Sequence, residues 1–495
     1  MADDRFARLE EVPQDPVLHN ADLEPATVEE RTWSKWSLAA LWVAMSISIP
    51  TYLLAGQLVA EMGMTWWQVM LAVLVGNVLV LVPMILNGHA GTKYGIPFPV
   101  FGRAAFGVFG THIPSIARAL VACGWFGIQT FVGGAAISVI IGMMWSGWAD
   151  LGGGAEFVGM SLQMWIAFMI FWAINIVIVV IGTEAIRWLE NLSAPFLIGI
   201  GLVLLWWAIS ETGGLGILLE ESSQLIEQEA EVSGFAWLIA VFLPAVTAMV
   251  GFWATLSLNI PDFTRYVEKQ KDQVIGQAIG LPTTMVFFSF VAVVVTSATV
   301  LVFDEGEIEN AWDPVELVEL IVGDESLILA LVAMIALAVA TLSTNIAANV
   351  VAPANSFANA FPKWISFRTG GIITGVIGIV IFPWLLIDHL PGFLVAYSGL
   401  LGPVGGILIA DYWLVRRTNL DVNALYDSQG EYRYTRGFNI KGIVALVAGI
   451  AVVLLGLVHP SVRFLFDGAW FTGFGVALVV YWLLMRGEVD PSGEV

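Results

Sequence analysis

The chain has 495 residues, of which 58% are hydrophobic and only 12% are charged, and its formal net charge is −21. Soluble globular proteins carry about 25% charged residues, so this composition excludes a soluble enzyme and a nucleic-acid-binding protein. The single cysteine, Cys123, excludes an intramolecular disulfide, and the five histidines have no metal-ligand spacing.

Uncharged segments long enough to cross a bilayer recur along the whole chain. A helix needs roughly 20 apolar residues to span about 30 Å of hydrocarbon. The uncharged stretches of 18 residues or more are 36–60, 62–92, 119–149, 157–183, 191–210, 232–261, 273–303, 326–362, 369–387, 389–410, 442–462 and 468–485. The sequence therefore predicts an all-α integral membrane protein with 12 transmembrane helices.

The basic residues indicate how these helices are oriented. If the N-terminus is cytoplasmic, 19 of the 20 Lys and Arg residues fall on that side, and only Arg463 falls outside. Basic loops stay cytoplasmic, so we expect a multi-pass protein of the cell membrane with both termini inside, residues 486–495 being the C-terminal tail. Residues 1–30 are acidic and polar, without the apolar core of a signal peptide. We expect them to form a disordered cytoplasmic tail.

Acidic residues occur on both faces of the predicted membrane protein, 21 inside and 20 outside. The loops at 211–231 and 304–325 are acidic and contain no basic residue. Such loops could guide a cationic substrate. Acidic charge on both faces favours the alternative, a surface that stays hydrated at high salt.

The first and sixth spans contain residues that interrupt helices. Pro50, in the first span, lacks a backbone donor and clashes with the carbonyl of Ser46. Gly251 lies at a corresponding depth in the sixth span. Because five spans separate them, the second interruption has inverted topology, which is typical of a transporter binding site at the bilayer midplane. Glycine and proline are also common in ordinary transmembrane helices, so this pattern alone leaves both interpretations open.

Ionisable side chains are absent from the middle of every predicted span. Arg118, Asp262 and Asp411 lie at the cytoplasmic margins, where we expect water to reach them. A proton pump or an acid–base enzyme usually needs a buried ionisable group. The remaining hydroxyls and amides suit a hard cation and a neutral polar ligand.

Aromatic and amide side chains form a candidate ligand site. Trp125 and Gln129 share one face of the third span, Asn345 and Asn349 share one face of the eighth, and Trp253 lies deep in the sixth. With 21 tryptophans in the chain, a structural role is the default for each one. Together, however, two deep indoles and nearby amides predict a site for a flat heterocycle, stacked on the rings and hydrogen-bonded at its edge.

Oxygen atoms of the first and eighth spans form a candidate cation site. Ser343 and Thr344 are adjacent hydroxyls, and Ala340 presents a carbonyl one turn earlier. Oxygen ligands suit hard cations, and freed carbonyls of Ala44 and Ile47 could complete the shell. Alternatively, the two hydroxyls bond carbonyls four residues earlier on their own helix.

Six segments carry a resemblance to a known family. They are NGHAGTKYGIPFPVFGRAAFG, GWFGIQTFVGG, GFWATLSLNIPDFTRY, STNIAANVVAPANSF, ISFRTGG and LLGPVGGILIADYWLVRR. Over about residues 30–485 the chain resembles the nucleobase:cation symporter-1 family, permeases for hydantoins, allantoin, uracil and related compounds. The resemblance implies a LeuT-like fold that works by alternating access. It would comprise two inverted repeats of five spans, at 31–210 and 232–415, with two further spans at 441–485.

The resemblance also implies roles for individual residues. Trp125 and Trp253 are similar to the aromatic pair that sandwiches the ligand, and Gln129 and Asn349 to the amide pair that bonds its heteroatoms. Leu394 is similar to a residue of span 10 that closes over the substrate. The positions that match the sodium site are Ala44, Ile47, Ala340, Ser343 and Thr344.

One residue departs from the family pattern. Sodium-coupled hydantoin carriers have an amide just before the proline of the first span, where this chain has Ser48. We include Ser48 among the substrate-binding residues. The departure weakens the case for hydantoin and leaves uracil or allantoin at least as well supported.

The sequence thus predicts a monomeric secondary symporter, and not an enzyme, for a planar heterocycle of the uracil, allantoin or hydantoin type. We expect sodium as the coupling ion, no other cofactor, the lipid bilayer as its surroundings and no nucleic-acid partner. The main alternative is a proton-coupled cytosine or purine permease. An amino-acid transporter of the same fold, a channel and a membrane-embedded enzyme are further alternatives.

Overall fold

Apolar helices make up most of the chain. The computed structural model describes residues 12–181, 198–199, 201–220, 223, 234–303, 312–322 and 327–487. In this part of the chain, eight helical stretches are long and apolar enough to cross a membrane, or nine if one bent pair counts as a span. Three shorter apolar helices are Gly201–Glu211, Phe367–Val380 and Ala469–Met485. A helical membrane protein is therefore confirmed, whereas the count of twelve spans stays a prediction.

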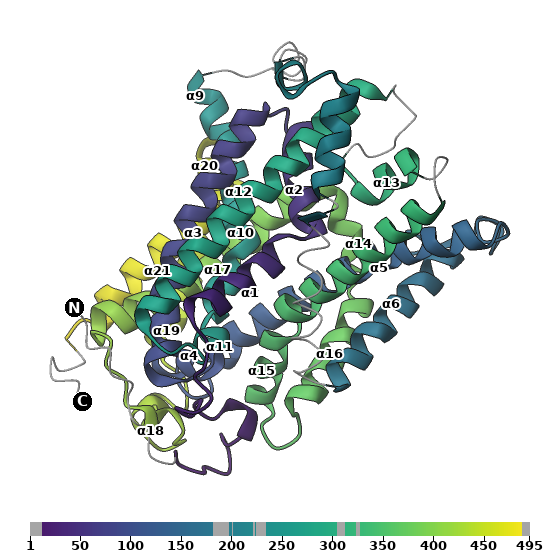
Figure 1. Ribbon diagram of the computed structural model, residues 1–495. Coiled ribbons are helices and arrows are strands. Elements are labelled where there is room, and N and C mark those ends of the chain that lie inside the picture. Colours follow the sequence, from purple (N-terminus) through teal and green to yellow (C-terminus); the bar gives the residue numbers. More distant parts are fainter. Residues whose placement is uncertain are drawn as a thin grey trace.

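Figure 1 shows the helices of the described residues, coloured in chain order. The first half contains η1 (Ala21–Leu23), α1 (Lys35–Ser46), α2 (Ile49–Ala60), α3 (Trp66–Tyr94), α4 (Phe98–Phe106), α5 (His112–Met144), β1 (Glu156–Phe157), β2 (Met160–Ser161) and α6 (Leu162–Ile181). The second half contains α9 (Gly234–Trp237), η2 (Leu238–Phe242), α10 (Leu243–Asn259), α11 (Pro261–Thr264), α12 (Gln270–Val302), α13 (Pro314–Val322), α14 (Leu327–Asn349), α15 (Val351–Ala360) and α16 (Phe367–Val380). The last part contains η3 (Pro383–His389), α17 (Leu390–Ile409), η4 (Ala410–Val415), α18 (Val422–Leu425), η5 (Glu431–Arg433), α19 (Ile440–Val458), η6 (Pro460–Val462), α20 (Phe464–Asp467) and α21 (Ala469–Met485).

Packing divides the long helices into two groups and an added layer. In the first group, which we call the bundle, α1 and α2 pack on α12, and α3 packs on both α10 and α12. In the second group, the scaffold, α5 packs on α6, α14, α15 and α16. Each group therefore combines helices from the first half of the chain with helices from the second. α17 packs on α10 of the bundle and also on α19 and α21, which form the added layer.

The first span is broken where Pro50 predicts a break. α1 ends at Ser46, α2 begins at Ile49, and the two helices are bent by 56°. Between them, Ile47 and Ser48 have non-helical backbone angles. Pro50 occupies the first turn of α2, where a missing N–H costs no helical hydrogen bond. The break therefore leaves buried backbone groups between α1 and α2 without their regular helical hydrogen bonds.

The expected interruption of the sixth span at Gly251 is wrong. α10 runs without a break from Leu243 to Asn259, because glycine weakens a helix without removing a hydrogen bond. The absence of a side chain at Gly251 instead allows close packing on α17. A Cβ atom there would lie 2.8 Å from the carbonyl oxygen of Leu394. The irregular backbone of this span lies before α10, in the π-helical segment η2.

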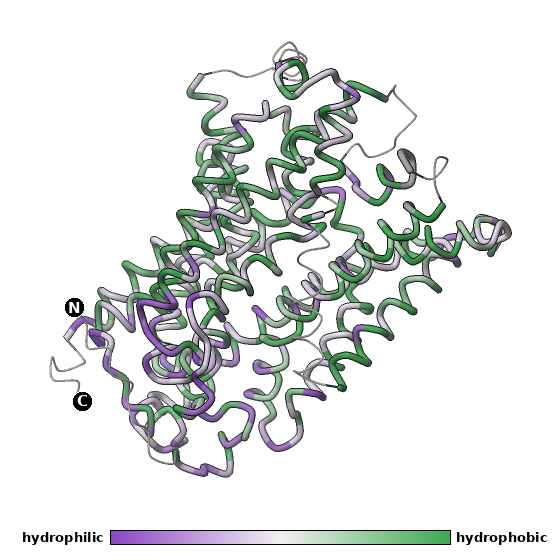
Figure 2. The backbone as a smooth tube through the Cα atoms, viewed as in Figure 1, coloured by the Kyte–Doolittle hydropathy of each residue, from purple (hydrophilic) through white to green (hydrophobic). Residues whose placement is uncertain are grey.

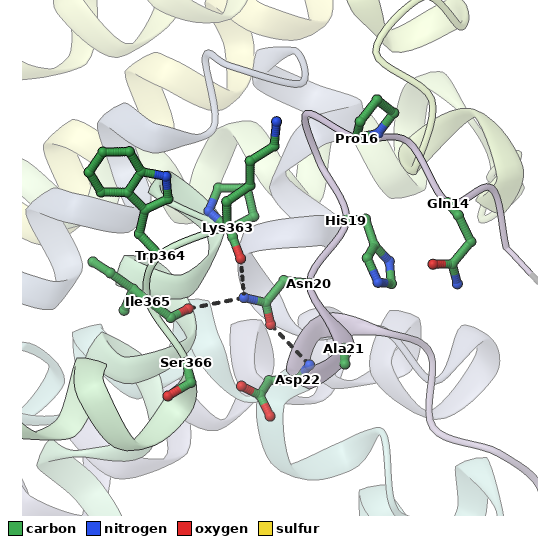
Figure 3. Close-up of a pocket in the computed structure, with 11 residues that line it drawn as sticks. Gln14, Pro16, His19, Asn20, Ala21, Asp22, Lys363, Trp364, Ile365 and Ser366 are labelled. Carbon is green, nitrogen blue, oxygen red and sulfur yellow. Dashed lines mark hydrogen bonds between the residues drawn. The ribbon is translucent and has the colours of Figure 1, made fainter.

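The N-terminal segment, residues 12–30, differs from the disordered tail that we expected. Asn20 donates hydrogen bonds to the carbonyls of Pro362 and Ile365, 2.9 and 3.0 Å away, in the connection between α15 and α16 (Figure 3). The hydroxyl of Tyr426 donates to the carbonyl of Leu23 at 2.7 Å. These contacts with distant parts of the chain give the segment a fixed place, which its polar composition did not predict. Residues 1–11 lie outside the described part.

A short hairpin replaces the start of the fourth predicted span. β1 and β2 pair antiparallel, with Val158 and Gly159 in the left-handed region at the turn, so α6 begins only at Leu162. Trp384 of η3 donates to the carbonyl of Val158 at 3.0 Å and holds the hairpin against the connection before α17.

The surface of the helices is suited to lipid. Figure 2 shows hydrophobic residues along the long helices, and hydrophilic residues gathered at the end of the molecule where α4, α18 and the N-terminal segment lie. On α3, outward-facing leucines and valines such as Leu71, Leu74 and Val82 are exposed. Exposed apolar side chains in this number indicate a hydrocarbon environment.

Candidate functional site

A small cavity lies between the bundle and the scaffold, and we call it the slot. Its lining residues are Met45, Ser48, Phe252, Trp253, Thr255 and Leu256 from the bundle, and Trp125, Gln129, Thr344, Ala348 and Asn349 from the scaffold. Six of the site residues chosen from the sequence therefore share one cavity. Its volume is about 20 Å³, which is room for roughly one water molecule, since a buried water needs about 10–15 Å³. The slot is closed in this conformation, and a planar heterocycle enters only if the two groups separate.

Aromatic rings surround the slot at steep mutual angles. The ring of Phe252 contacts both Trp125, with centroids 5.3 Å apart, and Trp253, 5.0 Å apart, each in an edge-to-face arrangement. Trp42 of α1 also contacts Trp253 edge to face, with ring centroids 5.1 Å apart. These contacts fix the orientation of both indoles, so that each offers a rigid face to a flat ligand.

Two polar atoms at the slot have no hydrogen-bond partner among the described residues. They are the acceptor Oε1 of Gln129 and the donor Nε1 of Trp253, and both are buried. An unsatisfied buried polar group costs about 1–3 kcal/mol and calls for an explanation. A ligand with an amide edge, which carries an N–H and a C=O, would satisfy both atoms at once.

Asn345 does not line the slot. Its amide nitrogen lies within hydrogen-bond distance of oxygens of Phe126, Thr130 and Asn175, and its own oxygen accepts a 3.1 Å bond from Nδ2 of Asn349. Asn345 is therefore an internal residue that orients Asn349. The i, i+4 spacing predicted that the two share a face, but it could not show which of them reaches the ligand.

Two of the proposed cation ligands contact each other across the two groups. Thr344 of α14 donates a 3.1 Å hydrogen bond to the carbonyl of Ala44 in α1. Ser343 is buried, and its hydroxyl has no partner among the described residues. The alternative was that both hydroxyls bond carbonyls four residues earlier on their own helix. Thr341 forms such a bond, to the carbonyl of Leu337 at 2.8 Å, but Ser343 and Thr344 do not. Free or shared oxygens at a helix break suit a hard cation.

The other proposed residues lie near the slot. Ala340 is buried on α14 one turn before Thr344, and Ile47 is buried in the break between α1 and α2. Leu394 is buried on α17 against Gly251 and does not line the slot. Ser48 does line it, with its hydroxyl 3.2 Å from that of Thr51.

Several slot residues escaped the sequence analysis. They are Met45, Phe252, Thr255, Leu256 and Ala348. Phe252 directly precedes Trp253 in the segment GFWATL, so its position beside that tryptophan could have indicated a further aromatic residue of the site. The others are ordinary apolar or hydroxyl residues whose importance depends only on where the helices bring them.

A layer beyond the slot contains a buried cation. Arg118 of α5, 0% exposed, donates from Nε to the Oδ1 of Asn259 at 3.0 Å and from Nη2 to the carbonyl of Ala348 at 3.4 Å. Asn259 belongs to the bundle and Ala348 to the scaffold, so this guanidinium joins the two groups on one side of the slot. The expectation that water reaches Arg118 is wrong, because helices cover it on every side.

Asp262 and Asp411 are also buried, at 2% and 1% exposure, contrary to the same expectation. Asp262, in α11, accepts from the backbone N–H of Phe98 at 2.9 Å. Burial raises the pKa of this carboxyl to about 6, although the Phe98 N–H and nearby arginines oppose the shift. Asp411 pairs with Arg416 at 3.1 Å and accepts from the hydroxyl of Tyr481 at 2.7 Å, which ties α21 to η4.

A larger cleft, of about 610 Å³, lies between the N-terminal segment and residues 362–366 (Figure 3). None of the site residues chosen from the sequence lines it. Its hydrogen bonds serve to hold the segment in place.

Comparison with known proteins identifies the family. Residues 25–480 match a family described as permeases for cytosine and purines, uracil, thiamine and allantoin. The chain belongs to the nucleobase:cation symporter-1 family. It is 42% identical to the purine-uracil permease of Arabidopsis thaliana over 95% of this chain and 78% of the relative, and 37% identical to the allantoin permease of Bacillus subtilis over 96% and 94%.

A solved structure has the same fold. It is Mhp1, a nucleobase-cation-symport-1 family transporter in a closed conformation with bromovinylhydantoin bound. The TM-score is 0.79, with 27% identity over 95% of each chain. The chain is therefore a permease for nucleobase-like compounds and not an enzyme, and the resemblance seen in the sequence is confirmed.

Proposed function

We propose that this permease imports a planar heterocycle of the uracil, allantoin or hydantoin type together with sodium, by alternating access. The observation that carries the proposal is the slot itself. It places two indoles, an unpartnered acceptor on Gln129 and an unpartnered donor on Trp253 between two helix groups. An amide-bearing ring complements this set in both shape and hydrogen bonding.

The same geometry supports coupling to a hard cation. Oxygens of Ala44 and Thr344 lie 3.1 Å apart and belong to different groups. A cation bound to both would draw α1 towards α14 and stabilise the conformation that holds the substrate. Such coupling requires tighter cation binding in that conformation, since equal affinity for both states shifts no equilibrium.

Sodium is favoured over protons by the side chains around the slot. None of the described residues that line it is ionisable, whereas a proton-coupled carrier usually has a carboxylate or histidine within reach. The alternative remains a proton-coupled cytosine or purine permease. An amino-acid carrier would need groups for a carboxylate and an ammonium, which these slot residues do not provide.

The choice of substrate rests on Ser48 and on the relatives. A hydroxyl at this position offers fewer hydrogen bonds than an amide. The Arabidopsis relative is named for purines and uracil and the Bacillus relative for allantoin. We propose uracil and allantoin ahead of hydantoin.

The orientation and assembly belong to this proposal. We infer twelve spans in two inverted repeats with an added pair, a location in the cell membrane, cytoplasmic termini and a monomeric state. The observation that supports the orientation is the distribution of basic residues, such as Arg265, which donates to the carbonyl of Asp22 in the N-terminal segment.

The first test is thermal stability of the purified protein with uracil, allantoin, hydantoin or cytosine, in sodium and in potassium at equal ionic strength. A ligand that binds only the folded protein raises the unfolding midpoint. We expect a rise with uracil or allantoin that is larger in sodium. An equal rise of the midpoint in both salts would indicate coupling to protons instead of sodium. No rise with any of the four compounds would refute the proposed ligand class.

Two variants separate the roles of cation and substrate residues. We expect Thr344→Ala to raise the sodium concentration needed for half-maximal ligand binding by about tenfold, since it loses one hard ligand and about 1.4 kcal/mol. Trp125→Ala removes a stacking face worth about 1–2 kcal/mol and should weaken ligand binding at saturating sodium. Titrations of ligand at several sodium concentrations measure both. Identical loss of ligand binding in the two variants at saturating sodium would contradict this division.

A further inference from the structure

Tyr397 of α17, three positions after Leu394, forms a hydrogen bond to an aromatic side chain of the slot. The side chain of Leu394 is buried against α10 and does not line the slot. Tyr397 is also buried, and its hydroxyl oxygen lies 3.4 Å from Nε1 of Trp125, which donates to it. The ring of Tyr397 meets that of Phe393 edge to face, with centroids 5.0 Å apart. The centroid of the Phe393 ring lies 6.4 Å from that of Trp125.

The same hydroxyl binds the bundle. It donates to the carbonyl of Gly251 at 2.6 Å, a short bond that is possible because α10 and α17 approach closely at this glycine. One phenol therefore joins α5 of the scaffold, α10 of the bundle and α17. Both its hydrogen-bonding functions are used, since the O–H donates to Gly251 and the oxygen accepts from Trp125.

The bond to Trp125 restricts the orientation of that indole. Without it the indole N–H would be buried and unpaired, since this is the partner that the structure gives it. The ring is fixed at its N–H by Tyr397 and at its side by Phe252. Rotation of the indole would turn the face that a flat ligand contacts. The position of α17 is thereby linked to the stacking surface of the slot.

We propose that Tyr397 is a positioning residue that orients Trp125 for substrate stacking and makes this orientation depend on the packing of α17 against α10. This inference rests on the proposed function, since it assigns how that slot is set for its ligand. When α17 moves away from α10, the phenol leaves either Gly251 or Trp125, and the indole loses its fixed orientation. When α17 returns, the stacking surface is restored.

The first experiment needs no ligand. The protein is labelled with 5-fluorotryptophan, and the resonance of Trp125 is assigned by its loss in Trp125→Phe. We expect Tyr397→Phe to shift or broaden this resonance, because the phenol no longer holds the indole. The matched control is Tyr426→Phe, which removes another buried hydroxyl that donates to a backbone carbonyl, that of Leu23, at 2.7 Å. An unchanged Trp125 resonance in Tyr397→Phe would overturn the proposal.

The second experiment is a double-mutant cycle on ligand affinity, measured with uracil and with allantoin at saturating sodium. Tyr397→Phe should weaken binding about 3- to 10-fold, as expected for one hydrogen bond. In the Trp125→Phe background, which keeps a ring but has no indole N–H, the same change should weaken binding less than about twofold. Tyr426→Phe should leave affinity unchanged even if it lowers the unfolding midpoint. Equal losses in both backgrounds would overturn the action through Trp125.

The two proposals fail in different ways. If the unmodified protein binds none of the heterocycles, the proposed function fails, and the fluorine resonance still decides whether Tyr397 orients Trp125. If the protein binds uracil or allantoin and Tyr397→Phe binds it equally well, the proposed function stands and the role of Tyr397 is wrong.

Discussion

At the scale of single residues, one buried positive charge, that of Arg118, lies next to the slot. Arg118 is fully buried and bonded to an amide and a carbonyl, and the described residues provide no carboxylate at ion-pair distance from it. Burying a charge without a full partner is costly. The bond to Asn259 crosses from the scaffold to the bundle, so it must break whenever these groups separate on that side.

The first prediction concerns the pH dependence of stability through Asp262, which lies outside the membrane-length helices. Burial raises its pKa from an ordinary 3.8 to about 6. Between these values the folded protein binds more protons than the unfolded chain, so the stabilisation is complete below about pH 4 and is lost as the pH rises to about 6. The lost stabilisation amounts to about 3 kcal/mol.

The test compares the native protein with Asp262→Asn, which is neutral at every pH and still accepts from Phe98. We expect the unfolding midpoint of the variant, relative to the native protein, to increase steadily from pH 4 to pH 6 and then to stay constant. Thermal unfolding at fixed ionic strength measures this difference. A difference that is constant over the range would show that the carboxyl keeps its ordinary pKa.

At the scale of elements, helix breaks and close helix contacts create the site. The break between α1 and α2 provides the carbonyl of Ala44 to Thr344. α14 ends at Asn349, four residues before Pro353, which cannot donate to the Asn349 carbonyl. Two slot residues, Ser48 and Asn349, therefore lie at helix ends, where backbone groups lack a partner within the helix.

The second prediction concerns the contact between α10 and α17 at Gly251. A Cβ added there would lie 2.8 Å from the backbone oxygen of Leu394, so Gly251→Ala forces the two helices apart. We expect a loss of about 1–3 kcal/mol in stability and weaker ligand binding, because overpacking displaces α17.

The matched control is Gly392→Ala on α17 itself, where nothing lies within 4 Å of an added Cβ. This change should be neutral or slightly stabilising, since alanine favours a helix. Thermal unfolding and ligand titration of both variants check the prediction. Equal behaviour of the two variants would mean that the contact at Gly251 is not tight in solution.

At the scale of the whole molecule, the closed slot implies that binding involves movement of the bundle relative to the scaffold. A cavity of about 20 Å³ cannot accept a heterocycle without such a change.

The third prediction follows for the kinetics of binding. Because opening must precede entry, the observed rate of uracil or allantoin binding should saturate as ligand concentration rises. The apparent association rate constant should also lie well below the diffusion limit, since a required conformational change slows association. Stopped-flow tryptophan fluorescence in saturating sodium measures both quantities. A rate that rises linearly at every accessible concentration would show that the closed slot is not the main conformation in solution.

The amino-acid sequence alone determined the class of the molecule. Long uncharged stretches require a hydrocarbon environment, and Pro50 requires a helix break, because these are local properties of the chain. The family and six of the residues around the slot were also accessible, since their types and spacing are local signals.

Only the tertiary structure decided which of these residues meet, and how. It showed that Gly251 permits close packing instead of interrupting α10. It also showed that Asn345 accepts a hydrogen bond from Asn349 and that Tyr397 contacts Trp125. It further showed that residues 12–30 have a fixed position and that Arg118 is buried. Most of these facts depend on contacts between residues that are far apart in the sequence, and sequence spacing determines side-chain geometry only within a single helix.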